Sequence, residues 1–159
     1  ALAWRGNPNS PADRGRSLDA VTRLAALAGP GRRLMAVQKL SPDELEPTDG
    51  ASGWRVAGTG DFVVEHPGPD FDAGRDAFLD AAAVLAACDH VVTIDSALAH
   101  LAAALGRPTA ILLKHVADWR WLEERPDTPW YPTVRLHRQT IPGDWTAPIA
   151  SVAAALRRR

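Results

Sequence analysis

The fold of this chain is decided by one stretch, residues 91–108, which reads VVTIDSALAHLAAALGRP. A short β-branched run ends at Asp95 and Ser96, and an almost wholly apolar helix follows until Gly106. A strand that turns directly into a helix presents open backbone N–H groups and the positive end of the helix dipole at one point. Such a point suits a phosphate group. The stretch therefore predicts an α/β fold and a ligand that carries phosphate.

Strands and helices alternate along the rest of the chain. We expect strands at 1–4, 34–38, 62–65, 91–94, 109–113 and 134–138, and helices at 18–28, 76–87, 97–105 and 145–158. This alternation predicts a Rossmann-like, three-layer αβα fold with a mostly parallel six-stranded sheet, as one domain over residues 1–159. Ligands of such sheets bind beyond the carboxyl ends of the strands.

Composition and charge exclude several classes of protein. Hydrophobic residues make up 46% of the chain, charged residues 23%, and the net charge is -1, so nothing points to nucleic acid as a partner. No stretch approaches the roughly 20 apolar residues of a membrane span. The single cysteine, Cys88, fits a reducing compartment, and we expect a cytoplasmic protein. The histidines show no ligand spacing, so no metal site is expected.

Two common nucleotide motifs are absent from the sequence. The arrangement G-x-G-x-x-G does not occur, and there is no Walker lysine loop, so neither a typical dinucleotide enzyme nor a P-loop enzyme is supported. The chain begins with Ala1, as a strand already under way and without an initiator methionine. We therefore expect a fragment of a longer protein.

Residues 93–108 resemble a known signature. The run TIDSALAHLAAALGRP is similar to the Asp-Thr-x-x-x-His-Leu-Ala-x-Ala-Leu-Gly-x-Pro pattern of glycosyltransferase family 9, the heptosyltransferase-like group. Ser96 stands where the family more often has Thr, and Ala97 where its heptosyltransferases often have Gly. The runs DWRWL (118–122), PWYP (129–132), RL (135–136) and RQ (138–139), with LAWRGNP (2–8) and RSL (16–18), resemble bacterial glycosyltransferase-like proteins that carry tetratricopeptide repeats upstream. The resemblance is weakest over residues 41–71.

The resemblance implies one half of a GT-B fold, in which two Rossmann-like halves face a cleft. The carboxyl-terminal half binds the nucleoside diphosphate sugar donor, and this chain resembles that half. The amino-terminal half and the repeats would lie upstream of Ala1. In heptosyltransferases the catalytic base comes from the amino-terminal half, so no catalytic residue is expected here and the isolated fragment would be inactive. The full protein would move a sugar from the donor to an acceptor hydroxyl, without an obligatory metal or other cofactor.

The donor site is expected around the start of the helix at 97–105. The backbone amides of Ser96, Ala97 and Leu98 would hold the diphosphate, and Asp95 would accept a sugar hydroxyl or order the loop. His100 lies four residues after Ser96 and shares its face of the helix, which places it for a phosphate or sugar contact. The alternative is that Asp95 and Ser96 only cap the helix and that His100 is a core histidine.

Cations for the diphosphate are expected in the loop after the first strand. The resemblance assigns this role to Arg16, in place of a family lysine, with Arg14 as the second candidate; the alternative is a solvated basic loop. An arginine can pair with a phosphate through two hydrogen bonds. Gln38 and Lys39 end the second strand and would touch the nucleoside or the sugar, unless they are an ordinary exposed strand end.

An aromatic cluster, Trp119, Trp121, Trp130 and Tyr131, lies between the last two strands. We interpret it as a small satellite core under a long loop, with stacking on a base or sugar as the alternative. Two other functions remain open at this stage. One is a catalytically inactive glycosyltransferase-like module that serves as an interaction platform beside tetratricopeptide repeats, and the other is a nucleotide-sugar epimerase.

Overall fold

Two sheets of different kinds form in the computed structural model, which describes residues 1–48, 53–76 and 78–158. The main sheet is parallel and has the order β1-β5-β6-β7. Its strands are β1 (Leu2–Ala3), β5 (Val91–Ile94), β6 (Thr109–Leu113) and β7 (Val134–Arg138). The second sheet is antiparallel, with the order β2 (Leu45–Pro47), β3 (Trp54–Val56) and β4 (Glu65–His66).

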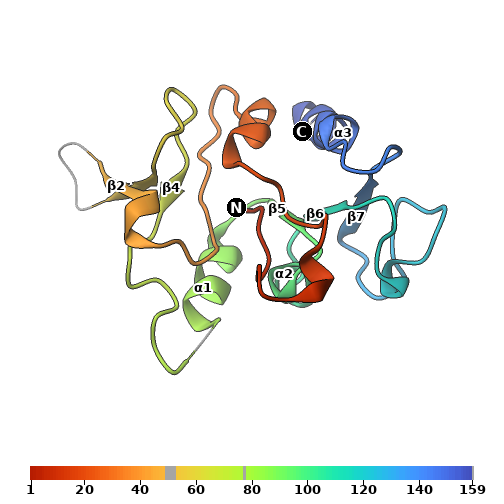
Figure 1. Cartoon of the computed structure of the whole chain (residues 1–159), viewed down its shortest axis with the longest axis horizontal. Helices are drawn as coiled ribbons and strands as arrows, with labels where there is room; N and C mark the ends of the chain where they lie inside the picture. The colour runs from red at the N-terminus through yellow and green to blue at the C-terminus, as the bar shows by residue number, and fades with distance from the viewer. Residues whose placement is uncertain (49–52, 77, 159) are drawn as a thin grey trace.

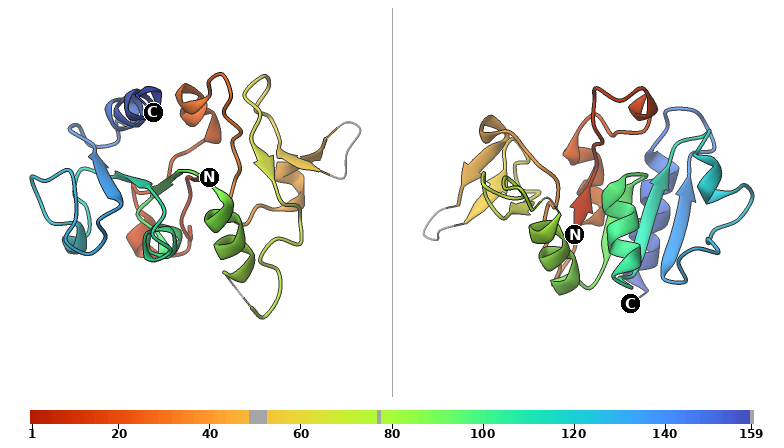
Figure 2. Two further views of the ribbon diagram at one scale, coloured as in Figure 1. Left: turned by 180° about the vertical axis from the view of Figure 1, so that it is seen from behind. Right: turned by 90° about the horizontal axis from the view of Figure 1, so that it is seen from below.

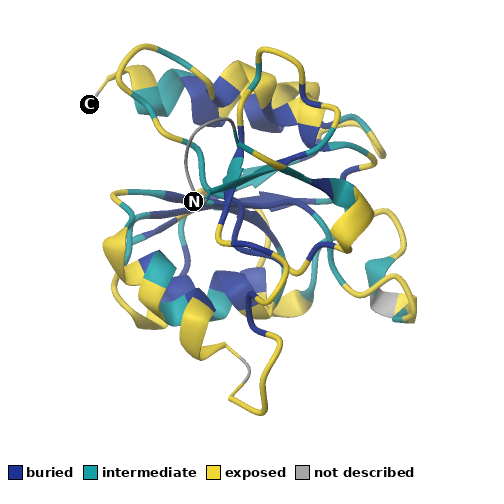
Figure 3. Cartoon of the chain, turned by 90° about the vertical axis from the view of Figure 1, so that its left-hand side faces the viewer, coloured by how far each residue is buried: buried dark blue, intermediate teal, exposed yellow. Residues whose placement is uncertain are grey.

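Helices cover both faces of the parallel sheet (Figure 1). On one face lie α1 (Leu79–Ala87) and α2 (Ala97–Ala104), and on the other α3 (Thr146–Arg157) and the 3-10 helix η2 (Val21–Leu27). The shorter 3-10 turns are η1 (Pro11–Asp13), η3 (Pro42–Glu44) and η4 (Trp119–Trp121). Seen from the side, the buried strands lie between two helical layers whose outer surfaces are exposed (Figure 3).

Alternation along β6 sends its side chains into core clusters on the two faces of the sheet. Ala110 and Leu112 of β6 pack into the cluster that η2 and α3 cover, and Ile111 and Leu113 pack into the cluster beneath α2 and η4. Successive side chains of a strand point to opposite faces of the sheet, and all five residues of β6 are buried. The predicted three-layer α/β arrangement is therefore confirmed around this central strand.

The expected six-stranded parallel sheet is wrong, because only four of its strands join the main sheet. Residues 34–38 form isolated parallel bridges instead of a strand, from Ala36 to Leu2 and from Met35 to Glu65. The expected strand at 62–65 is reduced to Glu65 and His66, which pair with β3 in the antiparallel direction. Glu65 thus has two neighbours, because it also keeps its parallel hydrogen bonds to Leu34 and Ala36.

The isolated bridges nevertheless show where the chain changes direction. The amide of Leu2 donates to the carbonyl of Met35, and the amide of Val37 donates to the carbonyl of Leu2. Residues 34–37 therefore lie beside β1 on the side away from β5. The chain leaves β1 toward one side and returns to β5 on the other, so β1 and β5 flank a topological switch point, where ligands of open α/β sheets bind.

The helix expected at 18–28 forms as the 3-10 helix η2. Its buried residues Val21, Leu24 and Leu27 are spaced three apart. This spacing matches the period of about three residues per turn of a 3-10 helix. The helices expected at 76–87, 97–105 and 145–158 form as α1, α2 and α3, with slightly different ends.

Candidate functional site

The loop that follows β1 extends across the carboxyl edge of the parallel sheet. This loop, residues 5–17, lies at the end of the sheet toward which the strand arrows point (Figure 2, right). Its turn η1 lies beyond the amino-terminal end of α2 in the views of Figures 1 and 2. Lys114, just after β6, donates a hydrogen bond of 3.1 Å from its ammonium group to the carbonyl oxygen of Arg14. Because β5 separates β1 from β6 in the sheet, the loop passes over the end of β5.

The start of α2 is open at this edge. Ser96 is the N-cap residue in extended conformation, and its side chain makes no capping hydrogen bond. The Ser96 hydroxyl lies 3.4 Å from the Thr93 hydroxyl instead. Of the residues that the structure describes, none supplies an acceptor to the N–H groups of Ala97 and Leu98. Open amides at a helix start carry partial positive charge, which is suited to an anion.

Arg16 is not a free cation in this loop. Its guanidinium lies 3.1 Å from the Asp13 carboxylate, and both side chains are largely buried. Asp13 also accepts a hydrogen bond from the hydroxyl of Ser17 at 2.8 Å, and the Ser17 hydroxyl accepts one from the Gly6 amide at 2.8 Å. The site residue that the resemblance favoured is thus held in a structural network that closes the base of the loop.

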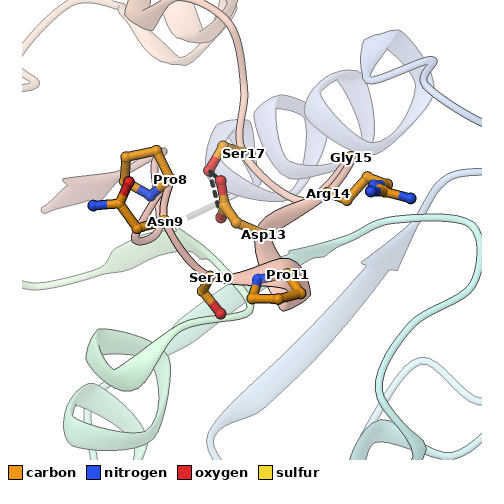
Figure 4. Close-up of a pocket in the computed structure, with 8 residues that line it drawn as sticks. All are labelled: Pro8, Asn9, Ser10, Pro11, Asp13, Arg14, Gly15 and Ser17. Carbon is orange, nitrogen blue, oxygen red and sulfur yellow. Dashed lines mark hydrogen bonds between the residues drawn. The ribbon is translucent and has the colours of Figure 1, made fainter.

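Arg14 has the opposite environment. It lines a cavity of about 530 Å³ formed by residues 8–11, 13–15 and 17 of the loop, and its guanidinium extends away from Asp13 and Ser17 (Figure 4). Among the described residues its guanidinium has no ion-pair or hydrogen-bond partner. Arg14 is therefore the loop cation that remains open to a ligand.

Gln38 is buried and hydrogen-bonded within the fold, whereas its neighbour Lys39 is exposed. The side-chain oxygen of Gln38 accepts hydrogen bonds from the amides of Trp4 at 2.7 Å and Arg5 at 3.0 Å, and the residue is buried. Gln38 therefore fixes the start of the loop after β1. Lys39 is exposed at the same edge. The guanidinium of Arg5 is paired with Glu44 at 2.7 Å.

His100 belongs to an aromatic cluster beside α2. Its ring stacks on that of Trp121, with 5.1 Å between centroids, and its Nδ1 lies 3.1 Å from the Tyr131 hydroxyl. Trp121 is fully buried, so the satellite-core interpretation is confirmed for it. It is wrong for Trp119 and Trp130, which are 70% and 57% exposed. Asp95, the remaining expected residue, is half-buried at the end of β5.

Two residues of this edge escaped the sequence analysis. Asp13 stands three positions before Arg16, a spacing that brings the two charges together in a turn. Lys114 comes directly after β6, the kind of position where ligand-facing side chains occur in parallel sheets. The residue types alone do not distinguish Asp13 and Lys114 from other charged residues near strand ends and loops.

A parallel sheet with an uncapped helix start and a basic loop at its carboxyl edge is the arrangement of phosphate-binding α/β proteins. Residues 73–115 match the family model of glycosyltransferase family 9 (heptosyltransferase). The match covers less than a third of the chain and contains the whole of α1, β5, α2 and β6. It supports membership of that family and a glycosyltransferase-like protein. No curated protein and no solved structure matches the chain.

The described residues contain neither a cluster suited to a metal ion nor a helix suited to a membrane. No group of three or more His, Cys, Asp or Glu side chains there is arranged to hold a metal ion. None of the helices in the described part of the chain has the length and apolar character to cross a membrane.

Proposed function

We propose that this chain is the donor-binding domain of a glycosyltransferase that moves a sugar from a nucleoside diphosphate sugar to an acceptor hydroxyl. The observation that carries the proposal is the open start of α2 at the switch point, on the sheet edge that the loop after β1 crosses. Arg14 lines a cavity within that loop. The family match contains this strand-to-helix turn, which supports the proposal independently of the geometry.

In this proposal the amides of Ser96, Ala97 and Leu98 bind the diphosphate. Hydrogen bonds to a charged group are worth about 1.5–3 kcal/mol each, so the helix start supplies a large part of the binding free energy. The guanidinium of Arg14 offsets the charge that develops on the leaving diphosphate, which removes the need for an obligatory metal. Asp95 accepts a hydroxyl of the sugar.

The other residues at the edge have supporting roles in the proposal. Arg16 acts through its ion pair with Asp13, which holds the loop in the shape that presents Arg14. Lys39, exposed beside the loop, contacts the nucleoside or the sugar, and Gln38 orients the loop through Trp4 and Arg5. His100 positions α2 against η4. The catalytic base and the acceptor site would belong to a second domain that faces this edge.

A proline substitution tests the helix start directly. Proline is tolerated at the first position of a helix and lacks the N–H group. Ser96 already has φ -155° and ψ 172°, a conformation compatible with a following proline. Ala97→Pro therefore removes one anion-binding amide and leaves α2 in place. Ala97→Ser is the matched control, because it changes the side chain and keeps the amide.

Calorimetry and thermal shift with ADP, UDP and GDP provide the readout. At least one of the three nucleotides should bind the unmodified chain, Ala97→Pro should weaken that binding about tenfold or more, and Ala97→Ser should bind normally. Arg14→Ala should also weaken binding, whereas Arg75→Ala, an exposed arginine in the loop before α1, should have no effect. Equal affinity of Ala97→Pro and the unmodified chain would refute the diphosphate site.

One observation favours a second candidate, the catalytically inactive glycosyltransferase-like interaction module. The Asp13 carboxylate neutralises Arg16, the cation at the position where the family carries a lysine. A domain that no longer binds a donor has no use for that charge. Absence of heat and of a thermal shift with all three nucleotides would support this candidate over the first.

A further inference from the structure

Two tryptophan side chains are exposed on the loop between β6 and β7. Trp119 is 70% exposed and Trp130 57% exposed. Both belong to residues 114–133, the turquoise segment at the far right of the sheet in Figure 1. Val116 and Leu122 of the same segment are also exposed. Large apolar side chains gathered on a surface mark a binding site more often than scattered ones do.

These two indoles are held in place by residue 120. The indole N–H of Trp130 donates to the backbone carbonyl of Arg120 at 2.7 Å. The guanidinium of Arg120 lies over the Trp119 ring, 4.8 Å from its centroid. Both rings therefore contact the same residue, Trp130 through the backbone of Arg120 and Trp119 through its guanidinium. Since Trp130 uses its only donor inside the protein, its contact with a ligand is through the ring surface.

A charged pair lies beside the two rings. Asp118 accepts hydrogen bonds from the backbone N–H of Arg120 at 3.0 Å and from its guanidinium at 2.8 Å, both on Oδ1. These bonds, the backbone one first, lower the pKa of Asp118, so that the carboxylate stays ionised. Among the described residues nothing else bonds to its Oδ2 or to the remaining guanidinium N–H groups, which are left to accept and donate hydrogen bonds. The surface thus combines aromatic faces with a fixed donor and a fixed acceptor.

We propose that Trp119, Trp130, Arg120 and Asp118 form a saccharide-binding site that shares no residue with the proposed donor site. A pyranose ring with one face of C–H groups covers an aromatic face, and its hydroxyl groups at the rim require donors and acceptors such as a guanidinium and a carboxylate. Indoles that are already ordered lose little conformational entropy when a ligand stacks on them. The inference does not depend on the proposed function, because it involves neither α2 nor the loop after β1.

Saturation-transfer NMR with methyl β-glucoside, methyl β-galactoside, methyl α-mannoside and cellobiose tests the site. At least one of these saccharides should bind at millimolar concentration, with the strongest transfer to the protons of a single face of the ring. Trp119→Ala and Trp130→Ala should each reduce the affinity at least fivefold. Leu105→Ala, which removes an exposed apolar side chain outside this segment, is the control and should leave the affinity unchanged.

Two results would overturn the inference. One is that none of the saccharides binds the folded chain, or that both tryptophan variants bind as well as the unmodified chain. The other concerns uridine and adenosine, tested in parallel. If Trp119→Ala weakens the binding of one of these nucleosides and leaves the binding of the saccharides unchanged, the surface is a nucleobase site. Thermal unfolding checks that the variants fold, and Trp119→Phe, which keeps an aromatic face, should retain part of the affinity. Binding of nucleoside diphosphates to Trp119→Ala should be normal, so failure of this site and failure of the donor site are distinguishable.

Discussion

The ammonium group of Lys114 donates a hydrogen bond to the carbonyl oxygen of Arg14 at 3.1 Å, across 100 residues of sequence. This bond connects the end of β6 to the loop that follows β1. It fixes the loop at the residue whose guanidinium we assign to the diphosphate, so Lys114 has a positioning role in the proposed site.

Substitution Lys114→Met should release this part of the loop. We expect faster amide hydrogen exchange in residues 8–17 and nucleotide binding weakened several-fold, because an ordering cost is added to binding. The free energy of unfolding should change by less than about 1 kcal/mol, since the bond is exposed. Exchange measured by mass spectrometry checks the first point and calorimetry the second. Unchanged exchange in the loop would rule out the positioning role.

Substitution Gly6→Ala should disrupt the base of the same loop. A Cβ at Gly6 would collide with the Asp13 carboxylate and the Arg16 guanidinium, so the ion pair has to move. We expect lower thermal stability and weaker nucleotide binding. Gly74→Ala is the control, because its Cβ would meet nothing closer than the Asp76 amide nitrogen at 3.9 Å. If both alanine variants behave alike, the network around Asp13 does not shape the loop.

Substitution Gln38→Leu should lower the free energy of unfolding by about 2 kcal/mol, because it leaves the amides of Trp4 and Arg5 without their acceptor. The neighbouring Lys39→Leu should change it by less than about 0.5 kcal/mol, since Lys39 is exposed. Urea unfolding curves of the two variants measure the difference. Similar losses in both would mean that the hydrogen bonds of Gln38 do not stabilise the chain.

Acidification should destabilise the fold through His66. Burial lowers the pKa of His66 below its usual 6.5, so the folded state binds fewer protons than the unfolded state as the pH falls through this value. The contribution of His66 to the free energy of unfolding is therefore complete above about pH 6.5 and decreases below that pH. Protonation would also place a proton on Nδ1, which accepts a hydrogen bond from Gly68.

Urea unfolding between about pH 7.5 and pH 5.5 should show a loss on the order of 1 kcal/mol. His66→Gln should flatten this dependence in part only, because burial lowers the pKa of His137 as well and contributes with the same sign. A pH dependence identical in His66→Gln and the unmodified chain would contradict the assignment.

The central elements were predictable from the sequence because their signals are local. The runs at 91–94 and 109–113 are short, apolar and β-branched, and Gly106 and Pro108 mark the end of the helix between them. The structure confirms both strands and the helix. A helix at 18–28 was also expected, but its 3-10 form, with Val21, Leu24 and Leu27 buried, was not.

The small sheet was not predictable in the same way. Trp54–Val56 was expected only as a brief pairing, and its partner Leu45–Pro47 contains a proline and a glutamate, which are poor signals for a strand. Glu65 pairs in parallel with Met35 and antiparallel with Arg55, and these pairings depend on which segments are nearby in space, which the sequence does not state.

In the candidate site, too, local features could be predicted from the sequence and long-range contacts could not. Its helix start was evident from Asp95 and Ser96, since a strand-to-helix turn is a local pattern. The pairing of Arg16 with Asp13 and of His100 with Tyr131 depends on side-chain orientation and on contacts over 31 residues. Similarly, Trp119 and Trp130 are exposed and Trp121 is buried. Because all three are tryptophans, the sequence does not indicate which of them is buried.

Residues 34–37 lie between β1 and the small sheet and are hydrogen-bonded to both. Their backbone is bonded to β1 on one side and to Glu65 of the small sheet on the other, and Gln38 follows at once with bonds to the start of the loop after β1. This segment therefore connects the small sheet to the start of the loop after β1 through consecutive hydrogen bonds. We expect a spectroscopic probe attached to the small sheet to respond when a ligand binds at the loop.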